Sequence, residues 1–416
     1  MRHKLLTICL CCMGWLGWPG SLLIAGIPGS LLISGVPGIS GMPGISAIQG
    51  ISAIQGISGI PAISGISSMV ALPAFSGIGI GTASAADTLS FPRDYGAHPE
   101  FQTEWWYLTG WLERPKQQSI GFQITFFRSK TAHDPADPSQ FAPGQIMIAH
   151  AALSDPQVGH LLQGQKRARA GFDIAFAKTP DTNLKLDDWT LQRRADGQYV
   201  ARVATGEFEL ELTLQPRQPT LLQGENGLSR KGPDPRASSY YYSEPQLQAK
   251  ARLLRRGKTS ELEGVAWLDH EWANQVVDPE GSGWDWLGVN LDDGSALMAF
   301  QMRAKDGKKL WAHATRRAKN GAIVHFGVDQ VNFEAQEHWR SPRTAVRYPV
   351  AQQLRLQDGK QIQLWRTEPL QLDQELDARP STGILYWEGA VNLWQDGKIR
   401  GLGYLEMTGY DKPVKL

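Results

Sequence analysis

The nine residues EWWYLTGWL, from Glu104 to Leu112, decide the fold class of this chain. Three of their four aromatic side chains are indoles, and bulky aromatic residues of this kind favour β-strands. Because successive side chains of a strand point to opposite faces, Trp105 and Trp106 cannot lie on the same side of a sheet. We therefore expect one indole inside a barrel and the other outside it, against a partner. A wide indole early in the first strand fills the floor of closed antiparallel barrels, a role that fits Trp106 and Trp284.

Strand signals continue along the rest of the chain. GFQITFF, FELELTL and GILYWEGAVNLW are short runs rich in β-forming residues, and Asp-Gly and Asn-Gly pairs that favour hairpin turns lie between such runs. No long stretch keeps a helical period free of Gly and Pro, although residues 371–379 could form one short helix. The pattern predicts an all-β, antiparallel protein built as barrels or sandwiches.

The chain repeats its first strands. GWDWLGVNL leads into AFQMRAKDG, as EWWYLTGWL leads into GFQITFFRSK. Trp106 to Phe122 spans sixteen positions, and so does Trp284 to Phe300. Each half also carries an Ala-His-Ala, centred on His150 in the first half. Such a repeat indicates two copies of one meander.

The later strands of the two halves match as well. YYYSEPQLQAKARL with GVAWLDHEW resembles ILYWEGAVNLW with GLGYLEMTGY, and this match aligns Asp269 with Glu406. The repeat predicts two tandem antiparallel β-barrel domains, residues 86–275 and 276–416.

Residues 1–85 have the composition of an export leader. Arg2, His3 and Lys4 precede an apolar run, and no Asp, Glu, Lys or Arg follows until residue 87. A small-residue cleavage site precedes Ala86, so we expect a signal peptide, expanded by short tandem repeats, and a periplasmic or secreted mature protein. An early start codon, an uncleaved membrane anchor and a small β-solenoid are the alternatives for this segment.

Cysteine and charge exclude several classes of function. All three cysteines lie in the leader, so disulfides, thiolate catalysis and cysteine metal sites are excluded for the mature protein. The chain has 42 Lys and Arg against 41 Asp and Glu and no basic run, which argues against nucleic acid as a partner. The histidines show no metal-ligand spacing, and no phosphate loop stands out, so we expect no metal and no cofactor.

The block AWLDHEW, residues 266–272, carries the best candidates for chemistry. On a strand, Trp267, Asp269 and Glu271 share one face, while His270 and Trp272 share the other. Burial beside indoles would raise the pKa of a carboxyl and keep it protonated. A neutral acid of this kind could protonate a C=C bond, aromatic faces would stabilise the tertiary cation, and water would capture it.

Structural roles are the alternatives for the same acids. Asp269 and Glu271 could instead pair with arginines such as Arg128 at a barrel mouth. Glu104 and Asp285, which also stand among aromatic residues, could accept hydrogen bonds from buried indole N–H groups. We expect Arg128 and Arg303 to cap the open ends of the barrels by stacking on tryptophan. The three tyrosines at 240–242 should divide between two faces, with one hydroxyl reaching a cavity.

Five ordered blocks resemble one known family. FPRDYGAHPEFQTEWWYLTGWL, SYYYSEPQL, GVAWLDHEW, GWDWLGVNLDDGSALMAFQMR and GLGYLEMTGY are similar to the blocks of the AttH-like family of secreted bacterial proteins, which is related to the carotenoid 1,2-hydratases (hydroxyneurosporene synthases). The resemblance implies two lipocalin-like barrels and an apolar ligand. In the hydratases an aromatic-x-Asp stands where this chain has Trp267 and Asp269. Those enzymes have Tyr in place of Trp267, a departure that removes a hydroxyl donor.

These observations lead to a hypothesis about function with two alternatives. We expect a protein that binds an elongated apolar ligand, such as an isoprenoid, polyene or lipid, at or between its barrels, and that acts as a hydratase, isomerase or cyclase if it is an enzyme. The alternatives are a lipid-transfer protein near the membrane, serving an envelope ABC-type transporter, and a secreted hydrolase, for which no G-x-S-x-G is present. The expected catalytic residues are Asp269, Glu271 and Tyr242. The expected ligand-binding residues are Glu104, Trp105, Trp106, Tyr240, Trp267, His270, Trp272, Trp284 and Asp285.

Overall fold

The computed structural model describes residues 88–133, 139 and 142–415. The predicted signal peptide, its cleavage site, the leader repeats and the three cysteines all lie outside these residues. Among the described residues, no helix combines the length and the apolar character needed to cross a membrane.

The first sheet contains thirteen antiparallel strands, which follow a 3-10 turn, η1 (Arg93–Tyr95). Their order in space is β4-β3-β2-β1-β13-β12-β9-β8-β7-β6-β5, with β10 and β11 also paired to β12. The strands are β1 (Thr103–Glu113), β2 (Ile120–Lys130), β3 (Gln145–Ser154), β4 (Leu161–Arg169), β5 (Ala175–Ala177), β6 (Asn183–Leu186), β7 (Trp189–Arg193), β8 (Tyr199–Ala204), β9 (Glu209–Gln215), β10 (Leu221–Leu222), β11 (Leu228–Arg230), β12 (Ser238–Arg255) and β13 (Lys258–Gln275).

The second sheet repeats this order with ten strands. Its path is β17-β16-β15-β14-β23-β22-β20-β19-β18, with β21 also paired to β22. In both sheets the first strand pairs with the last one, β1 with β13 and β14 with β23. The strands are β14 (Gly281–Leu291), β15 (Ala296–Ala304), β16 (Lys309–Arg317), β17 (Ile323–Phe326), β18 (Val331–Arg340), β19 (Arg347–Asp358), β20 (Gln361–Pro369), β21 (Glu375–Ala378), β22 (Ile384–Gln395) and β23 (Lys398–Thr408).

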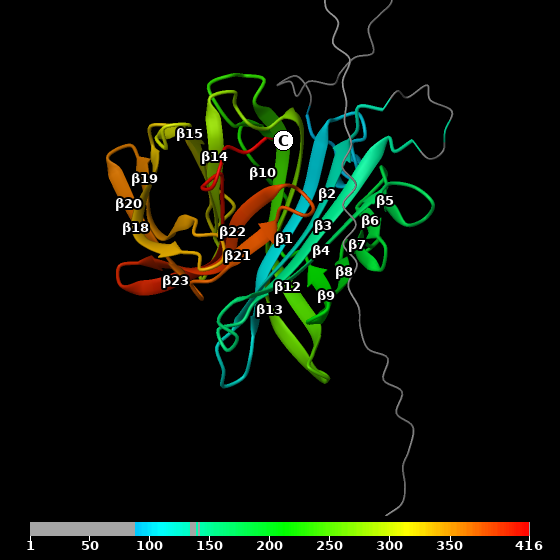
Figure 1. Ribbon diagram of the computed structural model, residues 1–416. Helices are drawn as coiled ribbons and strands as arrows, with labels where there is room; N and C mark the ends of the chain where they lie inside the picture. Colours follow the sequence, from blue (N-terminus) through cyan, green and yellow to red (C-terminus); the bar gives the residue numbers. More distant parts are fainter. Residues whose placement is uncertain (1–87, 134–138, 140–141, 416) are drawn as a thin grey trace, which may run out of the picture. The chain divides into compact units, whose positions relative to one another are not determined.

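Both sheets curl, so that strands far along the order approach each other. In the first sheet β3 and β4 contact β6, and in the second β16 and β17 contact β18 and β19 (Figure 1). The predicted fold class, two tandem lipocalin-like antiparallel barrels, is therefore confirmed. The chain passes from one sheet to the other between Gln275 and Gly281, and the division into independently folding domains at residues 275 and 276 stays a prediction.

The short helix predicted at residues 371–379 is wrong. Within this segment β21 pairs with β22, and Glu375 lies buried. Hydroxyl groups of Ser341, Thr344 and Tyr348 donate hydrogen bonds to the Glu375 carboxylate. These contacts come from distant parts of the chain and hold the segment as a strand, against its local preference.

Separate apolar clusters fill the interior of each barrel and the boundary between the two sheets. The first interior holds Trp106, Phe122 and Phe126, and the second holds Trp387 and Tyr348. Between the sheets, β1 and β2 contact β23 and β22. A further cluster of aromatic and methionine side chains fills this boundary: Tyr107, Trp111, Tyr241 and Trp267 from the first sheet, and Trp286, Met298, Phe300, Met302 and Tyr404 from the second. The outer faces of the two barrels therefore pack on each other.

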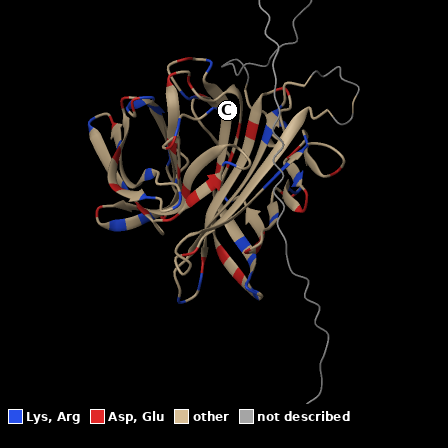
Figure 2. Cartoon of the chain, viewed as in Figure 1, with Lys and Arg blue, Asp and Glu red and all other residues tan. Residues whose placement is uncertain are grey.

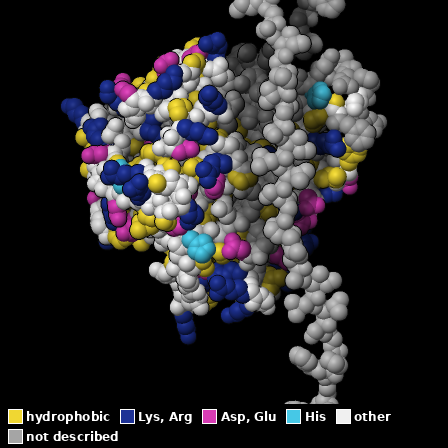
Figure 3. Space-filling view, in the orientation of Figure 1, with side chains coloured by type: hydrophobic (Ala, Val, Ile, Leu, Met, Phe, Trp, Pro, Cys, Tyr) yellow, Lys and Arg dark blue, Asp and Glu magenta, His cyan; other side chains and the backbone are white. Residues whose placement is uncertain are grey.

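Charged residues of both signs are spread over both sheets. Figure 2 shows acidic and basic positions interspersed along the strands, without a large region of one sign. Figure 3 shows the same mixture at the surface, where charged side chains alternate with apolar ones on the face in view. This distribution agrees with the near-equal counts of acids and bases in the sequence.

Candidate functional site

A narrow pocket with a cavity volume of about 70 Å³ lies between the outer faces of the two sheets. Its walls are mostly aromatic, and four carboxyl groups and one lysine point into it. Aromatic walls with a few convergent polar groups are typical of small-molecule sites. The lining residues are Thr103, Trp105, Tyr107, Thr125, Phe127, Lys231, Asp269, Glu271, Val276, Trp284, Trp286, Phe300, Tyr386, Glu388 and Glu406.

Asp269 lies in this pocket, and no cationic side chain of the described residues pairs with it. Its side chain is on β13, and the residue is only 3% exposed. Tyr241 Oη and Ser243 Oγ donate hydrogen bonds to its carboxyl oxygens at 2.6 and 2.5 Å, and Trp267 Nε1 donates at 2.6 Å. Burial raises the pKa of Asp269 to about 7, although these hydrogen bonds lower it. Asp269 is thus a carboxyl group that is protonated in part at neutral pH.

Glu271 differs from Asp269 because it has a counter-ion. Lys231 Nζ lies 2.7 Å from Glu271 Oε1, and both side chains are buried. Ser239 Oγ donates a further hydrogen bond to the same oxygen at 2.5 Å. The Lys231 ammonium also lies over the ring of Phe300, 4.8 Å from its centroid.

The predicted pairing of Asp269 and Glu271 with arginine is wrong among the described residues. Glu271 pairs with a lysine, and Arg128 Nε binds Glu104 Oε2 at 2.8 Å instead. Arg128 also donates to the backbone oxygens of His98 and Phe101. Arg128 therefore has its partners inside the first barrel.

The second sheet supplies two more acids, Glu388 and Glu406, which stand directly opposite each other on β22 and β23. Trp284 Nε1 donates a hydrogen bond of 2.9 Å to Glu406. Glu388 is 2% exposed, and its Oε2 atom has no hydrogen-bond partner among the described residues. Burial and the neighbouring carboxyl raise the pKa of Glu388, and burial raises that of Glu406. Neither glutamate was among the expected site residues, although the repeat aligns Glu406 with Asp269.

The strand register explains why that alignment of acids was correct. Asp269 stands opposite Tyr107 on β1, and Glu406 stands opposite Trp286 on β14. Trp105 therefore corresponds to Trp284, two residues before each of these partners. Trp106 and Trp284 each lie sixteen positions before a phenylalanine, but this equal spacing is a coincidence, because Trp284 matches Trp105 and not Trp106. A shift of one residue moves a side chain to the other face of the sheet.

The predicted floor role is wrong for Trp284, whereas Trp106 lies in the barrel interior, as that role requires. Trp106 is fully buried in the interior of the first barrel. Trp284 lines the pocket between the sheets, together with Trp105. The expected division of Trp105 and Trp106 between two faces is confirmed.

The tyrosine that reaches the acid is Tyr241, whereas Tyr242 points away from Asp269, and the catalytic role expected of Tyr242 stays a prediction that this position does not support. At the hairpin tip Arg255 stands opposite Lys258, but a register shift between Glu244 and Leu247 moves the pairing of β12 and β13 by one residue. Without this bulge Tyr242 would share a face with Asp269. With it, the Tyr242 hydroxyl lies 3.1 Å from His270 Nδ1 on the opposite face.

Three other expected ligand-binding residues lie away from the pocket. Tyr240 and Trp272 pack with Phe101 and Tyr242 in a small separate cluster. The His270 ring stacks on the Trp106 ring inside the first barrel, with 4.4 Å between the ring centroids. Trp267 contacts the pocket indirectly, through its hydrogen bond to Asp269.

Glu104 is the centre of a buried polar network. His270 Nε2 and His98 Nδ1 lie 2.9 and 2.8 Å from its Oε1 atom. Burial would raise the pKa of Glu104, but the hydrogen bonds and charges of both histidines outweigh burial and hold it well below its usual range. Burial lowers the pKa of His270 to about 4. These three residues are close enough to hold a metal ion, but Arg128 already neutralises the carboxylate, so we read the cluster as structural.

Asp285 forms a comparable ion pair in the second barrel. Arg303 Nη1 lies 2.5 Å from its Oδ1 atom, and the Tyr410 hydroxyl donates to the same atom at 2.9 Å. The Arg303 guanidinium lies 3.9 Å from the centroid of the Tyr410 ring, so it stacks on tyrosine where we expected tryptophan. Neither Glu104 nor Asp285 accepts a hydrogen bond from an indole among the described residues. Among the described residues, the carboxyl groups that accept hydrogen bonds from indoles are those of Asp269, Glu406 and Glu368.

The two Ala-His-Ala histidines connect the halves reciprocally. His150 Nε2, on β3, lies 2.9 Å from the hydroxyl of Ser381 in the second half. His313 Nε2, on β16, lies 3.2 Å from the hydroxyl of Ser229 in the first half. Burial lowers the pKa of both histidines, so each acts as a neutral hydrogen-bonding group. Neither is a lining residue of the pocket.

Comparisons with known proteins agree with this architecture. The family model described as AttH-like matches residues 82–410. The crystal structure of a putative AttH from Nitrosomonas europaea is 50% identical, covers 79% of this chain and 99% of that chain, and has a TM-score of 0.74. Kievitone hydratase from Nectria haematococca shares the fold at 12% identity, with 79% of this chain and 95% of that chain covered and a TM-score of 0.59. No curated protein matches the chain. On the family model and the 50% identical structure, this chain belongs to the AttH-like family.

Proposed function

We propose that this protein binds an elongated apolar molecule between its two barrels and adds water to a C=C bond of that molecule. One observation carries the proposal: Asp269 is buried in an aromatic pocket, no cation pairs with it among the described residues, and burial raises its pKa to about 7. A partly protonated carboxyl in such surroundings is a suitable general acid. Kievitone hydratase shares the fold of this chain.

The reaction has two steps with balanced charges. The Asp269 carboxyl transfers its proton to one carbon of the double bond, which leaves a carboxylate and a tertiary carbocation. The rings of Trp105, Trp286 and Phe300 line the same pocket and attract positive charge through their faces. Water then forms the C–O bond and gives a proton back to a carboxylate. The net change is the addition of one water molecule.

Glu271 and Lys231 suit the second step. Their ion pair of 2.7 Å lies on the same face of β13 as Asp269. An ionised carboxylate at that place can accept the proton of the attacking water, and its charge also favours the protonated form of Asp269. General acid and base catalysis of this kind contributes on the order of 10²–10⁴ in rate.

A lipid-transfer protein without chemistry is the second candidate. It needs the apolar pocket but tolerates acids that are exposed or paired with arginine. None of the four pocket acids is exposed, and none pairs with an arginine among the described residues. This arrangement favours the enzyme.

Binding can be tested with retinol, a neutral fluorescent polyene. Thr103 lines the pocket and is half-buried, so Thr103→Trp should fill the mouth and weaken retinol binding by about tenfold or more. Thr190→Trp makes the same exchange at a half-buried position of β7 and should leave binding unchanged. Equal retinol affinity of both variants and the wild type would show that retinol does not bind in this pocket.

Catalysis can be tested with lycopene, a neutral acyclic polyene, in ¹⁸O-labelled water. Mass spectrometry should detect a product that has gained one labelled water molecule. Asp269→Asn should abolish this product, whereas Glu244→Gln, which alters a buried carboxyl outside the pocket, should retain it. Labelled product from Asp269→Asn at the wild-type rate would exclude Asp269 as the acid.

A further inference from the structure

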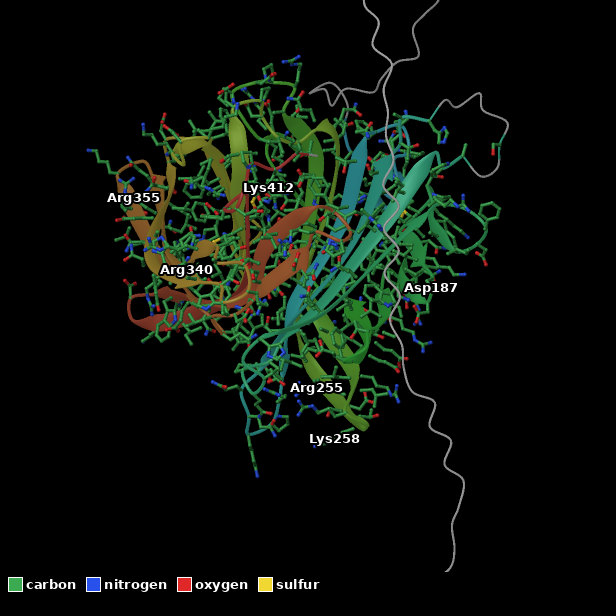
Figure 4. The ribbon with its side chains drawn as sticks, in the orientation of Figure 1. Asp187, Arg255, Lys258, Arg340, Arg355 and Lys412 are labelled. Atoms are coloured by element: carbon green, nitrogen blue, oxygen red, sulfur yellow. The ribbon has the colours of Figure 1, made fainter. Side chains whose placement is uncertain are left out.

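The pocket has more acids than it can neutralise. Asp269, Glu271, Glu388 and Glu406 face it, and Lys231 is the one cationic residue that lines it in the described part of the chain. Lys231 is already paired with Glu271 at 2.7 Å. Other cations lie elsewhere: Figure 4 shows Arg255 and Lys258 at the tip of the β12–β13 hairpin, and Arg340 and Arg355 on the second sheet.

Hydrogen bonding is equally uneven among these acids. Asp269 accepts three hydrogen bonds, and Glu271 accepts one from Ser239 besides its ion pair. Glu406 accepts one, from Trp284, and Glu388 Oε2 has no partner among the described residues. The Tyr107 hydroxyl, which lines the same pocket, is also without a partner there. A buried acceptor without a donor is costly, so Glu388 is suited to receive a ligand.

Glu388 and Glu406 also repel each other when both are ionised. They are direct cross-strand partners of β22 and β23, where side chains of neighbouring strands lie closest. Like charges at such a position destabilise a sheet, and here Glu388 is buried and Glu406 is half-buried. A positive charge between the two carboxyls would replace this repulsion with two attractions.

Aromatic rings complete the surroundings of this acid pair. Tyr386 precedes Glu388 by two residues on the same face of β22, and Trp286 stands opposite Glu406 on β14. Trp284 holds Glu406 by its indole N–H. Aromatic walls with a carboxylate are the usual site of a substituted ammonium group, whereas calcium and magnesium prefer oxygen ligands throughout.

We propose that the pocket binds an organic cation, with the substituted ammonium group held between Glu388 and Glu406 against the rings of Trp284, Trp286 and Tyr386. This site is distinct from the acid Asp269, and it does not depend on whether Asp269 protonates a double bond. A ligand with an ammonium group and an apolar body would occupy both parts of the pocket.

Choline and its neutral isostere 3,3-dimethylbutan-1-ol differ in charge but hardly in shape, so they test the proposal on the full-length wild type. We expect choline to bind about tenfold more tightly in calorimetry at about pH 7, because cation–π and carboxylate contacts favour the charged form. Choline should also release a proton from the acid pair, which titrations in buffers of different ionisation enthalpy measure. Equal affinity for both compounds, or no measurable binding of choline, overturns the proposal.

Variants separate the acid pair from the rest of the pocket. Glu388→Gln should weaken choline by about tenfold and leave the neutral isostere unchanged. Glu406→Gln should act in the same direction, which protects the test if one variant folds poorly. Glu244→Gln, a buried carboxyl outside the pocket, is the matched control and should bind choline like the wild type. If the protein binds retinol but does not distinguish choline from its isostere, the proposed binding of an apolar molecule stands and the proposed cation site is contradicted.

Discussion

The Tyr241 hydroxyl donates a hydrogen bond of 2.6 Å to Oδ2 of Asp269. The same hydroxyl accepts a hydrogen bond of 3.0 Å from Nε1 of Trp286. Tyr241 and Asp269 belong to the first sheet and Trp286 to the second, so the chain of hydrogen bonds crosses the boundary between the barrels. Protonation of Asp269 therefore depends in part on how the two halves pack.

Tyr241→Phe should raise the pKa of Asp269 further. The variant removes a donor that stabilises the charged carboxylate, while burial, the larger influence, remains. We expect an increase on the order of one pH unit above the wild-type value of about 7. An infrared titration of the carboxyl C=O band, assigned by its loss in Asp269→Asn, measures this shift. Tyr242→Phe, which removes the neighbouring hydroxyl on the opposite face, should leave the band unchanged. An unshifted band in Tyr241→Phe would contradict the role given to its hydroxyl.

Strand alternation explains how much of this site could be predicted from the sequence. It placed Trp105 and Trp106 on different faces, and it placed Asp269 and Glu271 together, because these inferences need only the direction of successive side chains. It also matched Asp269 with Glu406, since the repeat preserves the closing strands of both sheets.

The rest depended on long-range pairing that local sequence does not contain. The bulge between Glu244 and Leu247 decides whether Tyr241 or Tyr242 faces Asp269. At this bulge Gln246 has a φ of 58°, and its side-chain amide donates to the backbone oxygens of Leu291 and Ser295 in the second half. The arginine partner of Glu104 is its direct cross-strand neighbour on β2, and the register of the β1–β2 pair decides this contact. One weak signal could have identified Glu388 as a site residue. The repeat aligns Glu406 with Asp269, and Glu388 lies on the strand that pairs with the strand of Glu406.

Glu388→Gln should stabilise the protein increasingly as pH rises. Burial and the charge of Glu406 raise the pKa of Glu388 in the folded state above the ordinary value of 4.5. A raised pKa means that the folded state holds its proton where the unfolded state has lost it, so the wild type loses stability as pH rises above about 4.5. The neutral amide does not titrate. The difference in unfolding free energy should therefore move in favour of the variant, by at most about 1.4 kcal/mol per pH unit.

Urea denaturation at several pH values between about 5 and 8 measures this difference. Glu207→Gln, at an exposed position, is the control and should show no such trend. A constant difference between wild type and Glu388→Gln across this range would mean that the Glu388 carboxyl is ionised in the folded protein throughout.

Arg128→Met should destabilise the protein strongly. The guanidinium and the Glu104 carboxylate are both fully buried, and removal of one partner leaves an uncompensated charge. We expect a loss of about 3–5 kcal/mol in unfolding free energy, measured by urea denaturation. Arg202→Met breaks an exposed ion pair with Glu211 and should cost less than about 1 kcal/mol. Similar losses in both variants would show that the Glu104 network contributes no more than a surface pair.

Trp105→Ala and Trp106→Ala should separate binding from stability. Trp106 is fully buried in the barrel interior, so its truncation leaves a cavity and should cost about 3–5 kcal/mol. Trp105 is half-buried on the pocket wall, so its truncation should cost less and weaken retinol binding. Denaturation and retinol titration on both variants provide the comparison. If Trp106→Ala weakens retinol binding more than Trp105→Ala does while remaining folded, the ligand lies inside the first barrel.

Gly121→Ala should push the two sheets apart. A Cβ atom on Gly121, in β2, would lie 2.4 Å from the Cβ of Ala390 in β22, and both residues are buried at the boundary between the barrels. Because neither backbone can yield without moving its sheet, we expect a loss of about 1–3 kcal/mol in unfolding free energy. Ala390→Gly removes the opposing methyl group and should by itself cost about 0.5–1 kcal/mol. The double variant should be more stable than the sum of the two losses implies, with a coupling of about 1 kcal/mol or more. Strict additivity in this cycle would mean that the barrels are not held at the separation that places Tyr241, Asp269 and Trp286 in one chain of hydrogen bonds.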